Sequence, residues 1–386
     1  MKGGKYSKLQ SVFEGFETFL FVPNTTSKCG VHIHDAIDSK RTMTVVIIAL
    51  LPALLFGMYN IGYQHYLVNG VDAGFWATFF YGFLAALPKI IVSYLVGLGI
   101  EFIVAQMKGE EIAEGYLVSG LLIPMILPIQ TPLWQVIVAV AFSVIFVKEV
   151  FGGTGYNIFN VALVTRAFLF FSYPGQMSGD AVFIRTGKHW GLGAESLVDT
   201  YTGATPLGQV GVTESGVPAI TDAIGNPLTT LDYFIGLIPG SIGETSTLAI
   251  LLGALILIFT GIASWKIMVS VFAGGFLTAS LFNAIGTTGA MMLPAIDHLL
   301  LGGFAFGAVF MATDPVTASR TETGKWIYGF LIGFFAIAIR ALNPGYPEGM
   351  MLAILLMNAF APLIDFYVVD ANIQKRLKRA KAVAGK

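Results

Sequence analysis

The fold is decided by long apolar stretches, of which residues 74–104 are the clearest: GFWATFFYGFLAALPKIIVSYLVGLGIEFIV. A helix of about 20 apolar residues crosses the hydrocarbon core of a bilayer, and this stretch exceeds that length. It contains only two charged residues, Lys89 and Glu101, and Pro88 predicts a kink or a tilt. We therefore expect a membrane-spanning helix here.

The composition extends this expectation to the whole chain. Of its 386 residues, 55% are hydrophobic and 12% are charged, and the mean hydropathy is +0.75. Soluble domains carry about 25% charged residues, so a soluble enzyme, a nucleic-acid-binding protein and a disordered scaffold are excluded. The single cysteine, Cys29, excludes a disulfide framework, a Cys-ligated zinc site and a self-contained iron–sulfur cluster. The predicted fold class is an all-α polytopic membrane protein.

About ten stretches fit membrane crossings. They cover residues 43–67, 74–104, 117–130, 133–150, 157–173, 246–263, 265–284, 292–312, 326–342 and 347–367. The third and the fifth are short and flanked by Pro or Gly, which predicts half-helices or re-entrant segments.

Basic residues set the expected orientation and division of the chain. Most Lys and Arg residues fall on the side of the amino terminus, so the positive-inside rule places both termini in the cytoplasm. We expect a cytoplasmic amino-terminal segment (1–42), a first transmembrane repeat (43–173) and an outer, periplasmic loop (174–245). A second repeat (246–367) and a basic cytoplasmic tail (368–386) that contacts anionic lipid would follow.

A repeated spacing of Gly and Pro relates the two transmembrane parts. Gly120 is followed eight residues later by Pro128, and the same spacing joins Gly307 to Pro315. Five spans separate the copies, so they would have opposite orientations. Inverted repeats with interrupted helices place polar sites near the membrane midplane of transporters. We therefore predict two inverted five-helix repeats with broken helices.

Ionisable residues at span depth are costly and usually mark a pathway or a partner. Glu101, Asp314 and Asp365 supply carboxylates that suit an alkali cation. The alternative is that all three lie near inner ends of spans and simply reach water. Arg166, in mid-span, must have a partner, and it either binds an anionic group or ties two helices together.

The glycine-rich stretch 152–155 precedes a predicted helix that begins at Tyr156. Asn157 and Asn160 are three residues apart, which would place them on one helix face, where they could hydrogen-bond a planar polar ring such as a flavin. Alternatively, Asn157 caps this helix and Asn160 bonds to a neighbouring helix.

One short motif in the outer loop carries a specific resemblance. The chain reads Asp199-Thr-Tyr-Thr-Gly-Ala-Thr205, which taken alone is a turn with an exposed hydroxyl. It resembles the flavinylation motif of the sodium-translocating NADH:quinone oxidoreductase and its ferredoxin-dependent relatives, with Thr202 where Ser is usual. Four further stretches resemble the B-subunit family of the sodium-pumping enzyme: residues 148–155, 166–171, 311–315 and 343–351.

The resemblance implies roles for cofactors. Thr205 would carry FMN as a phosphoester that a flavin transferase attaches. Asn157 and Asn160 match positions associated with non-covalent riboflavin. Gly97 falls in a stretch associated with the quinone, either ubiquinone or menaquinone, and Leu98 departs from the family's second glycine there.

It also implies a place in a larger assembly. Glu101, Asp314 and Asp365 match acids linked to Na⁺ uptake, and sodium export would be coupled to electron transfer from FMN through riboflavin to quinone. The sequence has no dinucleotide fingerprint, so the NADH site would lie on another subunit of the complex in the bacterial inner membrane.

Two other functions stay open at this point. The chain could be the equivalent subunit of the ferredoxin-dependent complex, although residues 35–41 favour the NADH:quinone enzyme by resemblance. A redox-inactive channel or transporter with inverted repeats would have the same architecture, because a fold does not determine a function.

Overall fold

The computed structural model describes residues 29–31, 39–108, 115–178, 182–187, 201, 203–213, 216–343, 345–346 and 348–384. Within these ranges the regular structure is helical, apart from one isolated antiparallel bridge between Thr221 and Pro227. This confirms the predicted all-helical class.

The first transmembrane part contains five helical segments, the fourth of which continues as a π-helix. They are α2 (Ser39–Asn69), α3 (Phe75–Lys108), α4 (Tyr116–Met125), α5 (Leu133–Ser143) with η2 (Val144–Glu149), and α6 (Val161–Ser172). Pro52 and Pro88 lie inside α2 and α3 without ending them. Transmembrane helices tolerate such prolines because neighbouring helices and local adjustments satisfy the freed backbone groups.

Described residues of the predicted outer loop, 174–245, pack on the second transmembrane part. Its short helices are η3 (Pro174–Gln176), α7 (Pro206–Val212) and α8 (Thr230–Ile235). Leu207 of α7 and Tyr233 of α8 share a small apolar core with Leu293 and Leu301. The described residues of this loop therefore share their apolar core with the second transmembrane part.

The second transmembrane part contains long helices around a broken segment. In order they are α9 (Thr247–Phe259), α10 (Trp265–Ile285), α11 (Gly289–Met292), α12 (Ala295–Leu300), α13 (Phe304–Phe306), the π-helix η4 (Gly307–Met311), α14 (Glu322–Leu342) and α15 (Met350–Ala384). Gly302 and Gly303 separate α12 from α13 with φ angles of 65° and 66°. Side chains other than glycine rarely adopt this left-handed conformation, so these glycines interrupt the predicted eighth span.

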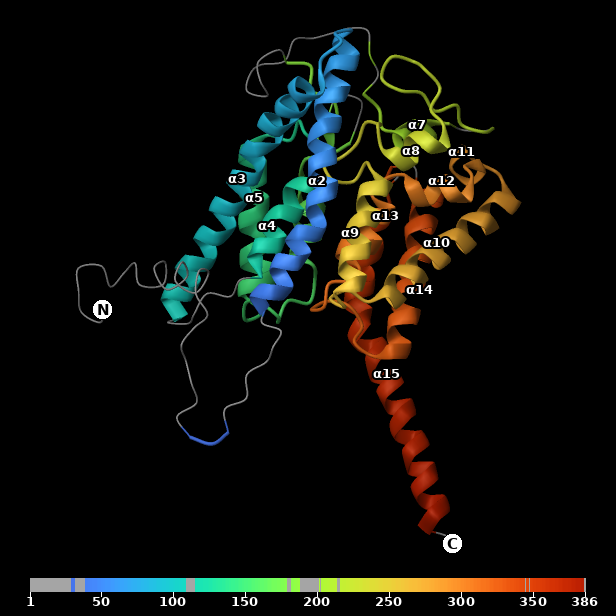
Figure 1. Ribbon diagram of the computed structural model, residues 1–386. Coiled ribbons are helices and arrows are strands. Elements are labelled where there is room, and N and C mark those ends of the chain that lie inside the picture. The colour runs from blue at the N-terminus through green and yellow to red at the C-terminus, as the bar shows by residue number, and fades with distance from the viewer. Residues whose placement is uncertain are drawn as a thin grey trace, which may run out of the picture.

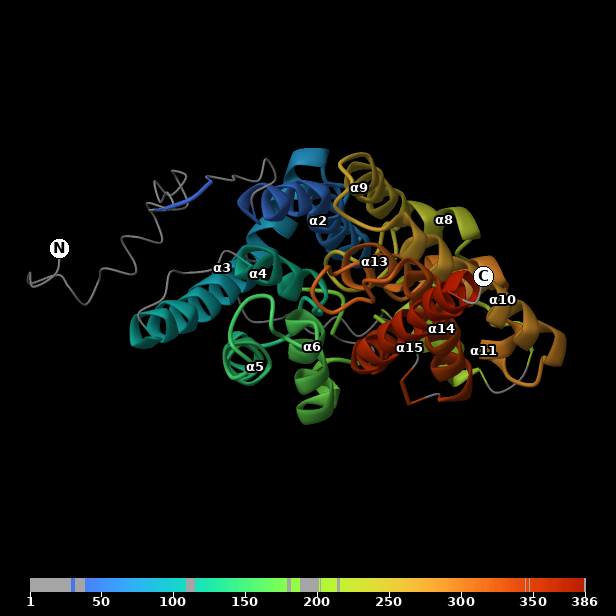
Figure 2. The same ribbon diagram turned by 90° about the horizontal axis from the view of Figure 1, so that it is seen from below.

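The two transmembrane parts stand side by side in Figure 1. The start of α2 and the end of α15 both lie toward the lower side of the view, whereas α7 and α8 lie toward the upper side. Seen from below in Figure 2, α2 lies beside α9 and α6 beside α15, and these pairs form contacts between the two parts.

Five helices are long and apolar enough to cross a membrane, namely α2, α3, α10, α14 and α15. Three shorter apolar helices, α4, α6 and α9, accompany them. These helices confirm a multi-pass membrane protein, and the short third and fifth segments correspond to α4 and α6. The total of ten crossings and the inverted repeat stay predictions.

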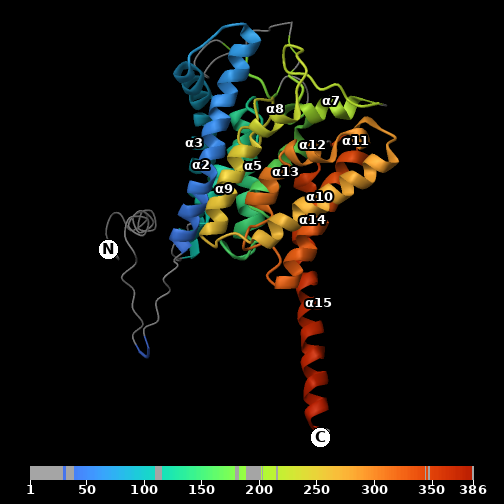
Figure 3. The ribbon, with the colours of Figure 1, turned by 45° about the vertical axis from the view of Figure 1, so that its right-hand side comes forward.

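The helix that contains the last predicted crossing continues beyond residue 367 into the predicted tail. Figure 3 shows α15 continuing past the other helices as one rod, which reaches Ala384. Residues 368–384 contain neither Pro nor Gly and are rich in Ala, Lys and Arg, which favour helix formation. The helix therefore has no reason to stop where the apolar stretch stops.

The packing of α2 on α3 generates a first testable expectation. A Cβ atom at Gly82 of α3 would overlap the carbonyl group of Met58, and one at Gly62 of α2 would overlap the backbone of Thr78. Small residues let transmembrane helices approach closely. We expect Gly82→Ala to lower the free energy of unfolding by about 1–3 kcal/mol, the usual cost of overpacking, measured by thermal denaturation in detergent.

Gly99→Ala is the matched control, because it lies on the same helix and an added Cβ there meets no atom within 4 Å. It should leave the stability unchanged or slightly raised, since Ala favours helices over Gly. Equal losses in the two variants would contradict the packing described for α2 and α3.

Candidate functional site

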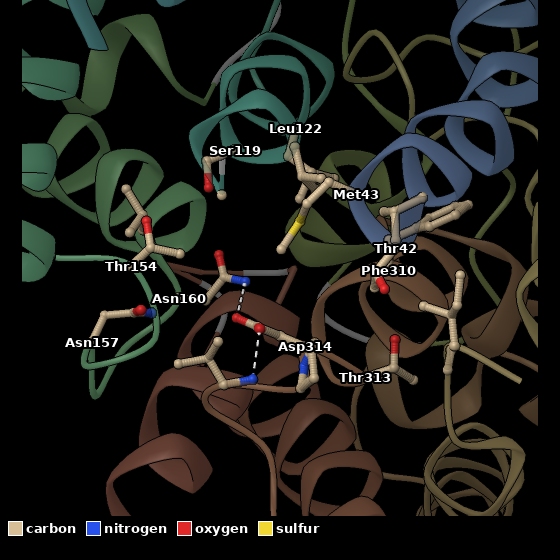
Figure 4. Close-up of a pocket in the computed structure, with 18 of the residues that line it drawn as sticks. Thr42, Met43, Ser119, Leu122, Thr154, Asn157, Asn160, Phe310, Thr313 and Asp314 are labelled. Carbon is tan, nitrogen blue, oxygen red and sulfur yellow. Dashed lines mark hydrogen bonds between the residues drawn. The ribbon is translucent and has the colours of Figure 1, made fainter. Parts of the chain in front are cut away.

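A cavity of about 110 Å³ lies between the two transmembrane parts, at the end where α2 begins. We call it the Asp314 cavity. Figure 4 shows its polar wall, where Thr154, Asn157 and Asn160 lie on one side of Asp314. Leu122 and Phe310 are among the apolar residues that line it. The sequence thus brings two predicted flavin-site residues and one predicted ion-pathway residue into one cavity.

Asn160 links the start of α6 to Asp314. Its Oδ1 accepts a hydrogen bond from the backbone N–H of Leu163 at 3.2 Å and so caps the helix. Its Nδ2 donates to Oδ2 of Asp314, also at 3.2 Å. Because α6 belongs to the first transmembrane part and Asp314 to the second, this pair joins the two parts across the cavity.

The prediction that Asn157 and Asn160 share a helix face is wrong, because Asn157 lies outside the helix. It precedes α6, which begins at Val161, and its Nδ2 donates to the carbonyl of Phe159 at 3.0 Å. Gly153 and Gly155 have φ angles of 95° and 92°, which keep this stretch out of a helix. Asn160, not Asn157, is therefore the cap, and both side chains line the Asp314 cavity from a loop and a helix start.

Asp314 follows η4 and is held by three hydrogen bonds. Its Oδ1 accepts from the N–H of Val316 at 3.0 Å, and its Oδ2 accepts from the hydroxyl of Thr317 at 3.1 Å and from Asn160. Charge-assisted bonds of this kind stabilise a carboxylate. The carboxylate is therefore fixed in the cavity wall.

Glu101 is buried, so the alternative that it simply reaches water does not describe it. Its side chain is 5% exposed and forms an ion pair with Lys148, which also lines the Asp314 cavity. The second carboxylate oxygen, Oε2, is buried without a hydrogen-bond partner among the described residues. An unsatisfied buried oxygen of this kind calls for a ligand or a moving partner.

Gly97 lies one turn before Glu101 on α3, and Tyr116 of α4 fills the space beside it. A Cβ at Gly97 would overlap the ring of Tyr116. The Tyr116 hydroxyl donates to the carbonyl of Ser93 at 3.0 Å, and the Lys148 amine lies 5.7 Å from the ring centroid. Glycine is thus required because the two helices approach closely through this ring.

Asp365 belongs to a separate cluster and does not line the Asp314 cavity. Its carboxylate accepts from the hydroxyls of Ser319 and Thr321 at 2.6 Å each, and from the backbone N–H groups of Arg320 and Thr321 at 2.8 and 3.0 Å. Hydrogen bonds to the charged form stabilise a carboxylate in that state. Asp365 therefore fastens α15 to the turn that leads into α14.

Thr205 caps α7 and lines a second cavity, of about 240 Å³, which we call the Thr205 cavity. Its Oγ1 accepts from the N–H of Gly208 at 3.1 Å, and Pro206 fixes the first helical position. The side chain is half-buried. Asp199 and Thr202 of the same motif lie outside the described residues.

Arg166 has the partners that its position demands. Its guanidinium donates to Oε1 of Glu244 at 2.7 Å and forms a second ion pair with Glu348. Arg166 and Glu348 both line the Thr205 cavity. Sequence reasoning identified the need for a partner but not these two carboxylates, because Glu244 lies in the outer loop and Glu348 in a stretch that stood out only as a motif.

Sequence comparison finds relatives over nearly the whole chain. A family model described as "NQR2, RnfD, RnfE family" matches residues 26–374. Three relatives are named as the B subunit of Na(+)-translocating NADH-quinone reductase. That of Chromohalobacter salexigens is 45% identical over 404 aligned positions, which cover 99% of this chain and 94% of the relative. Those of Ectopseudomonas mendocina and Haemophilus influenzae are 46% and 44% identical, and each comparison covers 98% of this chain and 96% of the relative.

The Arg166 cluster generates a stability expectation. Arg166→Met leaves Glu244 and Glu348 together without the guanidinium. Breaking a buried ion pair by removing one partner costs about 3–5 kcal/mol, so we expect the thermal midpoint of the purified protein to fall clearly. Lys266→Met, which removes the partially exposed pair with Glu322, should change it little. A larger loss for Lys266→Met than for Arg166→Met would contradict this assignment.

Proposed function

The chain belongs to the NQR2, RnfD, RnfE family, and we propose that it is the membrane subunit of a sodium-translocating NADH:quinone reductase. The observation that carries the proposal is the similarity to subunits of that name along nearly the full length of both chains. Those names favour this enzyme over the ferredoxin-dependent relative. NADH oxidation then belongs to another subunit of the complex in the bacterial inner membrane, and both termini of this chain face the cytoplasm.

Thr205 is the residue that we propose carries FMN. Its half-buried hydroxyl borders the Thr205 cavity, and the bond from Gly208 uses an oxygen lone pair rather than the hydroxyl proton. A flavin transferase would form the Oγ1–phosphorus bond as the pyrophosphate bond of FAD breaks and AMP leaves, with the proton passing to a base on the transferase. Tyr346 fits a polar ligand there, since its buried hydroxyl lines the cavity and has no hydrogen-bond partner among the described residues.

The Asp314 cavity fits a second flavin, riboflavin, in its donor set. Asn157 and Asn160 supply amides, and Thr154 supplies a buried hydroxyl whose oxygen has no partner in the described part of the chain. Apolar residues such as Leu122 and Phe310 would cover a ring system. Flavins in the two cavities would supply electron transfer to a quinone, either ubiquinone or menaquinone.

Gly97 marks the proposed quinone region on α3. The ring of Tyr116 fills the space beside Gly97 and is 0% exposed, and its hydroxyl donates to the carbonyl of Ser93. A quinone could therefore contact Gly97 itself only if the Tyr116 ring moved.

Sodium transport is proposed to involve Glu101, Asp314 and Asp365 by different means. Glu101 has an unpartnered buried oxygen, and its cationic partner Lys148 has a flexible side chain. Asp314 is in the wall of the cavity that Lys148 also lines. Asp365 acts through the turn at residues 319–321, which follows the Asp314 segment directly.

The flavin assignment is tested with Thr205→Ala. Flavin fluorescence on a denaturing gel should be present in the wild-type subunit, since a covalent bond survives denaturation, and absent in the variant. The wild type must come from a host that contains the transferase.

Two controls separate loss of the hydroxyl from loss of a helix cap. Thr205→Ser keeps a hydroxyl at the site and should retain the signal. Thr288→Ala removes another threonine cap, at the start of α11, at a cost of about 1 kcal/mol, and should leave fluorescence intact. Fluorescence that persists in Thr205→Ala would place the attachment elsewhere, and a wild type without any would favour a redox-inactive channel or transporter.

The ion assignment is tested with Glu101→Gln and Asp365→Asn in the assembled complex. Each removes a negative charge from the proposed pathway, so we expect slower quinone reduction. The Na⁺ concentration for half-maximal activity should rise by about tenfold, the effect of losing about 1.4 kcal/mol of attraction. Glu322 is an exposed carboxylate next to Thr321, which bonds to Asp365. Glu322→Gln should leave the Na⁺ concentration for half-maximal activity unchanged. Unaltered sodium activation in both test variants would remove these carboxylates from the pathway.

A further inference from the structure

A small cavity of about 30 Å³ adjoins the Thr205 cavity, and we call it the Ser241 cavity. It is lined by the turn that contains Ser241, Glu244 and Thr245, by the glycines between α12 and α13, and by Glu348. A space of this size holds one water molecule or one bare cation, but no organic group.

Two buried hydroxyls in this cavity have no hydrogen-bond partner among the described residues. Ser241 is 2% and Thr245 is 4% exposed, and their side-chain oxygens are both orphaned. Buried polar groups are almost always paired in native proteins. Two such groups that line one cavity therefore point to an occupant that binds oxygen atoms.

Two carboxylates complete the set of oxygen ligands. Glu244 binds Arg166 through Oε1, and Glu348 binds it through Oε2, so each keeps a second oxygen. Arg340, the other nearby guanidinium, donates instead to backbone carbonyls, including that of Glu348 at 3.2 Å. One guanidinium thus contacts two carboxylates directly.

Glycines on both sides of the cavity leave room that side chains would occupy. A Cβ at Gly303 would lie 2.6 Å from Oε1 of Glu244, and one at Gly240 would lie 2.9 Å from Cγ2 of Thr245. The left-handed φ of Gly303 adds a second reason for glycine. The cavity is therefore kept open by the backbone itself.

We propose that the Ser241 cavity binds one alkali cation, with Ser241 Oγ, Thr245 Oγ1 and carboxylate oxygens of Glu244 and Glu348 as its ligands. Hard oxygen donors suit such cations. The described residues contain no group of three or more His, Cys, Asp or Glu side chains that could hold a metal ion, which argues against a transition-metal centre. The two neutral hydroxyls and the shared guanidinium favour a single positive charge.

This site is distinct from the acids at the other end of the molecule. Glu101 and Asp365 do not line it, and Asp314 lines a different cavity. It adjoins Thr205, which lines both outer cavities. That the cation is sodium, bound at the outer end of the transport path, rests on the proposed function, whereas the oxygen cage does not.

Thallous ion on the wild-type complex is the first test. Tl⁺ is a monovalent cation with strong anomalous scattering, and crystals soaked in it should show a peak within bonding distance of Ser241 Oγ and Thr245 Oγ1. Excess NaCl should remove the peak. An absent peak, or one that neither excess NaCl nor excess KCl removes, would overturn the proposal.

The binding stoichiometry for ²²Na⁺ is the second test. The double variant Ser241→Ala/Thr245→Val keeps side-chain volume nearly constant and should bind one sodium ion fewer than the wild type at the same free concentration. Loss of even outer-shell partners weakens metal sites about 10- to 100-fold, so loss of two ligands should empty this one. Equal stoichiometry in a folded double variant would overturn the proposal.

A matched pair of hydroxyls serves as the control. Ser270→Ala/Thr260→Val removes hydroxyls that bond to backbone carbonyls of Ile267 and Ile256, and it should bind as many ions as the wild type. If the test variant does not fold, the Tl⁺ peak in the wild type decides. A Tl⁺ peak in a protein that carries no flavin would support the cation site and contradict the proposed function. Sodium-dependent quinone reduction without a Tl⁺ peak would support the proposed function and contradict the cation site.

Discussion

The buried guanidinium of Arg166 joins three segments that are far apart in the sequence. Arg166 lies on α6, Glu244 on the turn before α9, and Glu348 just before α15. A charge at this depth must be neutralised by the protein, so these segments converge or the fold fails. Because Arg166 and Glu348 also line the Thr205 cavity, the same ion pairs that hold the outer loop on the bundle shape the space beside Thr205.

Helix α6 also joins distant segments near its amino-terminal end. Asn160 caps it and bonds to Asp314 of the second transmembrane part. Asn160 and Arg166 are six residues apart, which corresponds to about 9 Å along a helix axis. One short helix therefore reaches both cavities and ties the two transmembrane parts together at each. A change that displaces α6 should therefore alter both cavities.

Sequence reasoning succeeded where a single physical constraint dominates. The apolar length of residues 74–104 was enough to predict α3, and the cost of a charge in lipid was enough to predict that Arg166 has a partner. It failed where the answer depends on contacts distant in the sequence. The ring of Tyr116 beside Gly97 and the four hydrogen bonds on Asp365 have no local signature. The prediction that Asn157 and Asn160 share a helix face was wrong because the left-handed glycines before them delay the helix to Val161. The proposed role of Thr205 came from a motif, and no periodicity or composition pointed to it.

The central claim is that Thr205 is esterified by FMN, and mass spectrometry tests it most directly. The subunit is purified from a host that contains the flavin transferase, its intact mass is measured, and the peptide with residues 203–213 is fragmented. The expected result is an added mass of FMN less one water, retained on the fragment that contains Thr205. An unmodified mass, or the same addition on another residue, would contradict the claim.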